Sequence, residues 1–161
     1  MERFYQDFIQ RLGDMYDDLE TAVSGLPQEA LDWVPGADMN SLCVLVVHVV
    51  GAARYWVGDV CVGDVSNRDR DAEFAAKGHS DQALKAILKD SLRYSRGVVE
   101  NLSISDLAQM CPAPGRPITP GSNELRQFSL GWSLLHALEH TSVHVGHAQI
   151  TRQLWDQRYT G

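Results

Sequence analysis

The chain has 161 residues, of which 44% are hydrophobic and 22% are charged, and its formal net charge is -7. Length and composition are typical of a soluble globular protein, and we expect one domain over residues 1–161. The negative charge argues against nucleic acid and anionic lipid as partners, and no apolar run is long enough to predict a membrane span.

The N-terminal segment carries charges where a secretion signal needs an apolar stretch, so we expect a cytoplasmic protein. The three cysteines, Cys43, Cys61 and Cys111, are odd in number and show no CxxC spacing. This pattern predicts neither a disulfide framework nor a thiolate zinc site, and it favours buried, unreactive thiols.

The first predicted helix is amphipathic. Apolar residues recur at helical spacing from Phe4 to Val23, and Gly25 supplies a stop. Pro27 can then open a short helical turn that reaches Leu31.

The second predicted long helix begins at the capping residues Asn40 and Ser41 and ends near Gly63. It is the most apolar part of the chain, which indicates a buried helix. The charged, nonperiodic segment 64–78 that follows predicts a loop crossing between helices.

Two more long helices complete the predicted fold. Ser80 or Asp81 caps a third helix that runs to about Leu102. Four prolines and two glycines between Cys111 and Ser122 predict a surface loop, and the last helix is expected over about 124–157. We therefore predict an all-α fold, a four-helix bundle with long crossover loops.

Four of the six histidines lie in the last predicted helix: His136, His140, His144 and His147. At about 100° per residue they project onto one face of the helix. Leu154 continues this stripe, so we expect the face to point inward. Imidazoles four residues apart, such as those of His140 and His144, can both bind one ion.

His48 supplies a third candidate ligand from the apolar second helix, where an unpaired ring nitrogen would be costly to bury. A divalent metal held by His48, His140 and His144 would satisfy it. The alternative is a set of core histidines that bond to protein groups. His136 and His147 are expected to support the ligands or to face solvent, because three nitrogens already make a site.

The segments VLVVHVVGAARYW and HALEHTSVHVGHAQITRQLW together resemble the DinB-like superfamily, which includes YfiT-type proteins. The resemblance covers nearly the whole chain. It implies a four-helix bundle whose metal ligands are one histidine of the second helix, here His48, and an HxxxH pair, here His140 and His144. Gly146 matches the family pattern, whereas Val145 and His147 stand where arginine and glutamine are frequent.

The resemblance implies a metal-dependent enzyme that transfers a low-molecular-weight thiol to an electrophilic small molecule. Three neutral imidazoles leave a coordination position open, and the ion could lower the pKa of bound water toward about 7 or bind a thiol as its thiolate. Zinc or nickel is favoured, and iron, cobalt or copper also suit the ligands. The alternatives are a metal-dependent hydrolase, a non-catalytic metal- or ligand-binding stress-response module, or a metal-free bundle.

Two expectations concern residues other than the candidate triad of His48, His140 and His144. Glu139 and Asp38 are candidates for positions near the pocket, and Glu139 is equally expected as an outward surface carboxylate. The sequence assigns no general base or other catalytic residue. Homodimerisation is expected as an option, with Trp132, Trp155 and Tyr159 as candidate exposed aromatics.

Overall fold

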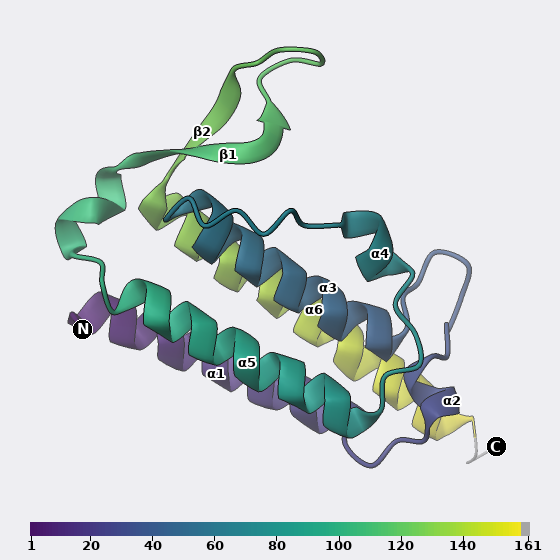
Figure 1. The fold of residues 1–161 in the computed structure, drawn as a ribbon. Coiled ribbons are helices and arrows are strands. Elements are labelled where there is room, and N and C mark those ends of the chain that lie inside the picture. Colours follow the sequence, from purple (N-terminus) through teal and green to yellow (C-terminus); the bar gives the residue numbers. More distant parts are fainter. Residues whose placement is uncertain (159–161) are drawn as a thin grey trace.

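The computed structural model describes residues 1–158, which are mostly helical (Figure 1). The elements in chain order are α1 (Arg3–Val23), α2 (Gln28–Leu31), α3 (Leu42–Arg54), the π-helix η1 (Tyr55–Val60), α4 (Arg70–Phe74), α5 (Asp81–Val99), the 3-10 helix η2 (Ile104–Ala108), β1 (Met110–Pro117), β2 (Leu125–Ser129) and α6 (Leu130–Gln157). Helix α1 packs against α5 and α6, and α3 packs against the same two helices. The predominance of helix agrees with the sequence, but the two strands depart from the predicted all-α class.

Helix α3 is the buried centre of this arrangement. The Ser41 hydroxyl accepts a hydrogen bond from the Val44 amide and so caps the helix where the sequence predicted. The segment Leu42–Val60 is long and apolar enough to cross a membrane by composition alone, yet 78% of the residues in its scanned window are buried inside the fold. Such burial is typical of the core helix of a globular domain.

Helix α6 begins later than predicted. Ser129 caps it by accepting a hydrogen bond from the Trp132 amide, so the helix starts at Leu130 and not near residue 124. Residues 125–129 are instead extended and pair with β1. A capping serine directly after an extended segment ends one element and starts the next.

The segment predicted as a proline-rich loop contains the strand β1 of a β-hairpin, which lies above one end of α3 and α6 in Figure 1. Its antiparallel register pairs Cys111 with Phe128 and Pro112 with Gln127, then shifts before Pro117 pairs with Leu125. Both strands of a two-stranded sheet are edge strands, so prolines can occupy positions whose missing amide is not needed.

The segment predicted as the crossing loop contains the short helix α4. Asp69 caps it by accepting a hydrogen bond from the Ala72 amide. Helix α4 lies over α3 (Figure 1). This placement buries Glu73 against the middle of α3.

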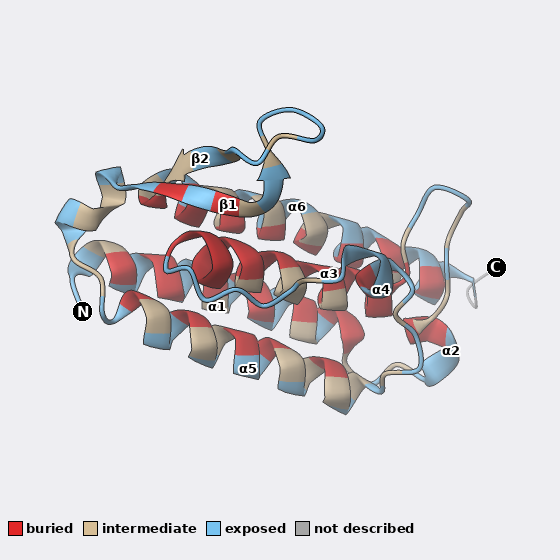
Figure 2. Cartoon of the chain, turned by 45° about the horizontal axis from the view of Figure 1, so that its top comes forward, coloured by how far each residue is buried: buried red, intermediate tan, exposed pale blue. Residues whose placement is uncertain are grey.

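Buried residues occur along all four long helices, α1, α3, α5 and α6, as the red segments in Figure 2 show. All three cysteines are buried and free, as expected. Burial raises the pKa of each thiol, that of Cys61 to about 12, which agrees with the predicted unreactive role.

Candidate metal centre

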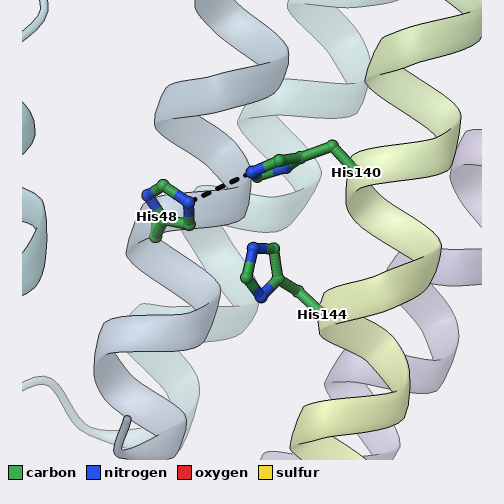
Figure 3. A group of neighbouring side chains, drawn as sticks. All are labelled: His48, His140 and His144. Atoms are coloured by element: carbon green, nitrogen blue, oxygen red, sulfur yellow. Dashed lines mark hydrogen bonds between the residues drawn. The ribbon is translucent and has the colours of Figure 1, made fainter. Parts of the chain in front are cut away.

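The three predicted ligands meet between α3 and α6 (Figure 3). His48 projects from the middle of α3 and is buried, while His140 and His144 project from successive turns of α6 and are half-buried. One ring nitrogen of each residue lies within 4.8 Å of the others. The i, i+4 spacing on α6 therefore faces His48, as the sequence predicted.

The spacing of the His48 and His140 nitrogens suits a transition metal. His48 Nε2 lies 3.1 Å from His140 Nε2. Two nitrogens each about 2.0–2.1 Å from one tetrahedral zinc are about 3.3 Å apart, so only a small adjustment of these rings is needed. A set of three imidazoles also leaves at least one coordination position open.

Two residues that the sequence did not single out hold His48 in place. Glu73 Oε2 lies 2.9 Å from His48 Nδ1, and Arg68 holds the same carboxylate through Nε at 2.6 Å and Nη2 at 2.7 Å. The carboxylate accepts the Nδ1 proton of His48, which leaves the Nε2 lone pair facing the other histidines. Nothing in the charged segment 64–78 distinguished Glu73 from its acidic neighbours, although the capping pattern at Asp69 could have indicated a helix.

The environment keeps the three imidazoles neutral. Burial lowers the pKa of His48, and Glu73 only partly opposes this effect. Burial, followed by repulsion from His144 and His48, lowers the pKa of His140 to about 3, and burial with repulsion from His48 lowers that of His144 to about 4. Neutral rings have the lone pairs that a metal ion requires.

The other two histidines of α6 occupy different positions. His147 Nδ1 lies 3.3 Å from His144 Nδ1, so His147 contacts a candidate ligand. His136 stacks on Trp132 at 4.8 Å between ring centroids and lies edge-on to Trp56 at 4.7 Å. His136 is therefore packed among aromatic rings rather than bonded to the triad, although its ring centroid is 6.2 Å from that of His140.

The remaining candidates are more peripheral. Glu139 is exposed and approaches His136 at 3.3 Å. Asp38 lines a cavity of about 210 Å³ that also contains His147. Of the aromatic residues considered for an interface, Trp132 is exposed, Trp155 is buried against Trp33, and Tyr159 lies outside the described residues.

A second cavity, of about 380 Å³, lies next to Arg68 where α4, η1 and β1 approach each other. Arg116 extends over the Trp56 ring at 4.8 Å and the Tyr55 ring at 5.4 Å. Asn67 adopts a left-handed backbone conformation in the wall, with φ of 52°. The cavity is lined by Tyr55, Asp59, Val65, Asn67, Arg68, Arg70, Pro114, Gly115 and Arg116. Its three arginines suit an anionic group.

A helical fold that brings one histidine of α3 to an HxxxH pair of α6 defines the class of DinB/YfiT-like proteins. Within that class, a model of the mycothiol S-transferase family matches residues 7–157, and the chain belongs to this family. A crystal structure of a conserved protein from Enterococcus faecalis has a similar fold, with a TM-score of 0.68 and 14% identity over 96% of this chain and 98% of that one. No curated protein matches the sequence.

Proposed function

We propose that the protein is a metal-dependent thiol S-transferase whose ion is held by His48, His140 and His144. The observation that supports this most is the convergence of three neutral imidazoles, with ring nitrogens within 4.8 Å of one another, in a chain of the mycothiol S-transferase family. Mycothiol is therefore the first thiol to test. Zinc or nickel is the first ion to test, and imidazole ligation also suits iron, cobalt and copper.

The chain's own residues position and shield the reaction. When bound, a divalent ion would supply the positive charge that keeps a thiol deprotonated at neutral pH. Glu73 orients His48, and Phe74 covers the His48 ring at 4.6 Å between centroids, which limits water access. In the proposed reaction the thiol loses its proton to solvent, its sulfur bonds to an electrophilic carbon, and the leaving group departs with the electrons of the bond that breaks.

The arginine-lined cavity would hold an anionic substituent of one substrate. Arg68 belongs to both this cavity and the Glu73 contact that orients His48, so the cavity adjoins the metal centre. A carboxylate on the thiol or on the electrophile would gain charge-assisted hydrogen bonds from the guanidinium groups there.

The test has two stages. Elemental analysis of tag-free protein purified without chelator should find about one metal equivalent in the wild type and none in His48→Ala or His140→Ala. His79→Ala removes a histidine away from the triad and should keep the metal. Metal-loaded protein should then conjugate mycothiol or another low-molecular-weight thiol to electrophiles, and chelated protein should not. Metal-dependent cleavage of esters or amides without a thiol would instead favour a hydrolase, and wild-type protein that binds no metal would contradict the proposal.

Further parts of the same proposal concern the whole molecule. We infer that α1, α3, α5 and α6 form the four-helix bundle that the resemblance implies, since each of α1 and α3 packs on both α5 and α6. A cytoplasmic location and the lack of nucleic-acid and membrane partners stay predictions from the N-terminal sequence and the net charge of -7.

A further inference from the structure

The charges around the cavity of about 380 Å³ are not balanced. Of its three arginines, Arg68 donates two hydrogen bonds to the Glu73 carboxylate. Arg70 and Arg116 have no carboxylate within ion-pair distance among residues 1–158. Asp59, the acidic residue of the lining, is itself paired with an arginine outside the lining. The cavity therefore carries two positive charges that no nearby carboxylate offsets.

This local excess of positive charge contrasts with the whole chain, whose formal net charge is -7. An acidic protein repels anions on average, and a cavity that concentrates positive charge reverses the field locally. Both Arg70 and Arg116 are exposed, so an anion in solution can reach them without any opening of the fold. The two arginines thus supply an accessible site for negative charge.

Aromatic rings hold both guanidinium groups in place. The Arg116 guanidinium lies over the Trp56 ring at 4.8 Å and over the Tyr55 ring at 5.4 Å. The Arg70 guanidinium lies over the Phe74 ring at 5.1 Å. Stacking uses the face of a guanidinium and leaves the N–H groups at its edge free for an anion. Because the side chains are already ordered, less conformational freedom is lost when an anion binds.

Two features of the backbone mark the wall of this cavity. Tyr55 and Asp59 belong to the π-helix η1, and π-helical turns occur frequently at functional sites. Asn67 is the sole non-glycine residue with a positive φ in the described part of the chain. A left-handed backbone is costly for such residues and is found mostly where function requires it. These features do not depend on the arginines, and they favour the same cavity as a ligand site.

One aromatic ring separates the cavity from the candidate metal centre. The centroid of the Phe74 ring lies 5.1 Å from the guanidinium carbon of Arg70 and 4.6 Å from the centroid of the His48 ring. Phe74 therefore contacts both sites. A small molecule whose acidic group binds Arg70 needs to extend by only about the length of one ring to approach the triad.

We propose that the cavity binds the carboxylate of an acidic electrophile, and that Arg70 and Arg116 determine the specificity for it. A planar carboxylate matches the paired N–H groups of a guanidinium. The thiol has the ion as its anchor, whereas the electrophile needs a protein group that holds its reacting carbon near the sulfur. The choice of the electrophile rests on the proposed S-transferase function, whereas carboxylate binding does not.

Calorimetric titration tests carboxylate binding without any reaction. Metal-loaded protein should bind benzoate at least about tenfold more tightly than the neutral analogue benzamide. Arg70→Gln and Arg116→Gln should each weaken benzoate binding about tenfold, because a charge-assisted hydrogen bond is lost. Arg126→Gln is the matched control, since Arg126 is an exposed arginine of the same hairpin outside the cavity lining. Equal benzoate affinity in all four proteins, or no benzoate binding, would overturn the proposal.

A second titration separates the cavity from the ion, to which a carboxylate can also bind. Chelator-treated wild type should keep its affinity for benzoate within about threefold, because Arg70 and Arg116 do not hold the ion. Benzoate binding that disappears with the ion would place the carboxylate on the metal and contradict the arginine site. This measurement is valid whether or not the protein transfers a thiol.

Substrate preference tests the assignment to the electrophile. In para-(chloromethyl)benzoate one ring separates the carboxylate from the reacting carbon, and para-(chloromethyl)benzamide is its neutral counterpart. Mycothiol sulfur would bond to the chloromethyl carbon while the carbon–chlorine bond breaks and chloride leaves with its electrons. The ratio of kcat/KM for the acid to kcat/KM for the amide should fall about tenfold in Arg70→Gln and Arg116→Gln and stay unchanged in Arg126→Gln.

Comparison of this ratio between proteins cancels the difference in intrinsic reactivity between the two chlorides. An equal ratio in the wild type and both cavity variants would overturn the assignment to the electrophile. If the wild type binds benzoate but transfers the thiol to neither chloride, the S-transferase function and with it the acidic electrophile are contradicted, while the carboxylate site itself is supported.

Discussion

Glu73 connects His48 to a guanidinium outside the candidate metal centre. Its carboxylate lies 2.9 Å from His48 Nδ1, and both carboxylate oxygens accept hydrogen bonds from Arg68. A carboxylate that accepts the outer N–H of a ligating imidazole fixes the tautomer and makes the ring a better donor to the ion. Arg68 fixes the orientation of that carboxylate and prevents its charge from being buried alone.

Glu73→Gln should weaken metal binding about 10- to 100-fold. The amide keeps the shape and can still accept the Nδ1 proton, but it loses the negative charge that favours His48 as a donor. Competition with a chromophoric chelator would measure the change. Glu29→Gln, an exposed position on α2, serves as the control and should bind metal like the wild type, and an unchanged affinity in Glu73→Gln would show that the carboxylate does not support the site.

The convergence of His48, His140 and His144 was predictable from the sequence, whereas the residues that hold His48 in place were not. An imidazole inside an apolar helix and a second pair at i, i+4 are local patterns, and each limits where the side chain can point. Glu73 acquires its role only when α4 folds back over α3, a tertiary contact that local spacing does not encode. Among several acidic residues in a charged segment it carried no distinguishing signal.

At the scale of elements, Gly51 determines how closely α4 approaches α3. A methyl group at this position would overlap the Glu73 carboxylate. We expect Gly51→Ala to displace Glu73 from His48 and to lower metal affinity about tenfold without changing a ligand. Chelator competition would again provide the measurement.

Gly97→Ala is the matched control for that substitution. Gly97 lies inside α5, and a methyl group there meets no atom within 4 Å. It should raise the free energy of unfolding by about 0.5–1 kcal/mol through helix propensity and leave metal affinity unchanged. If Gly51→Ala leaves the metal affinity unchanged, as Gly97→Ala should, then close packing at Glu73 does not affect metal binding.

The π-helix η1 is tied to the following loop by the buried Asp59. Its carboxylate accepts hydrogen bonds from Arg54 Nη1 at 2.8 Å, the Ser66 hydroxyl at 2.9 Å and the Ser66 amide at 3.1 Å. Asp59→Asn removes the charge opposite Arg54 and places amide hydrogens against a donor. We expect a loss of about 2 kcal/mol in the free energy of unfolding, measured with urea. Asp90→Asn breaks an exposed ion pair with Arg93 and should change stability by less than about 0.5 kcal/mol.

The features that the sequence missed are those that helical periodicity does not reveal. The long helices repeat a core-facing pattern over many residues, so periodicity located them. The hairpin contains prolines that normally break regular structure, and it is possible only because both strands are edges. Helix α6 is a different case. Its exposed apolar residues carry the same helical period as its core face, and periodicity alone cannot tell the two faces apart. These residues are Trp132, Leu135, Val143, Ile150 and Leu154, so the expectation that Leu154 marks the inward face is wrong.

For the whole molecule, the three histidines should make the stability of the metal-free protein depend on pH. Their pKa values lie below the unfolded value of 6.5, at about 3 for His140 and about 4 for His144. Between these values the unfolded chain binds more protons than the folded one, so folding stability must fall as the pH drops from about 6.5 toward 4. Below both folded values the difference in bound protons disappears and the slope from these groups ends.

Urea unfolding of chelator-treated protein from roughly pH 7 to 5 would measure this dependence. Replacing two of the groups, in His140→Gln with His144→Gln, should flatten the curve, because the glutamines do not titrate. The ion bound to the wild type should raise the stability by a nearly constant amount over this range, because the folded His140 and His144 rings are already unprotonated there. Equal slopes in the metal-free wild type and the double variant would mean that the rings are protonated in the folded protein without cost, and the environment inferred for the triad would then be wrong.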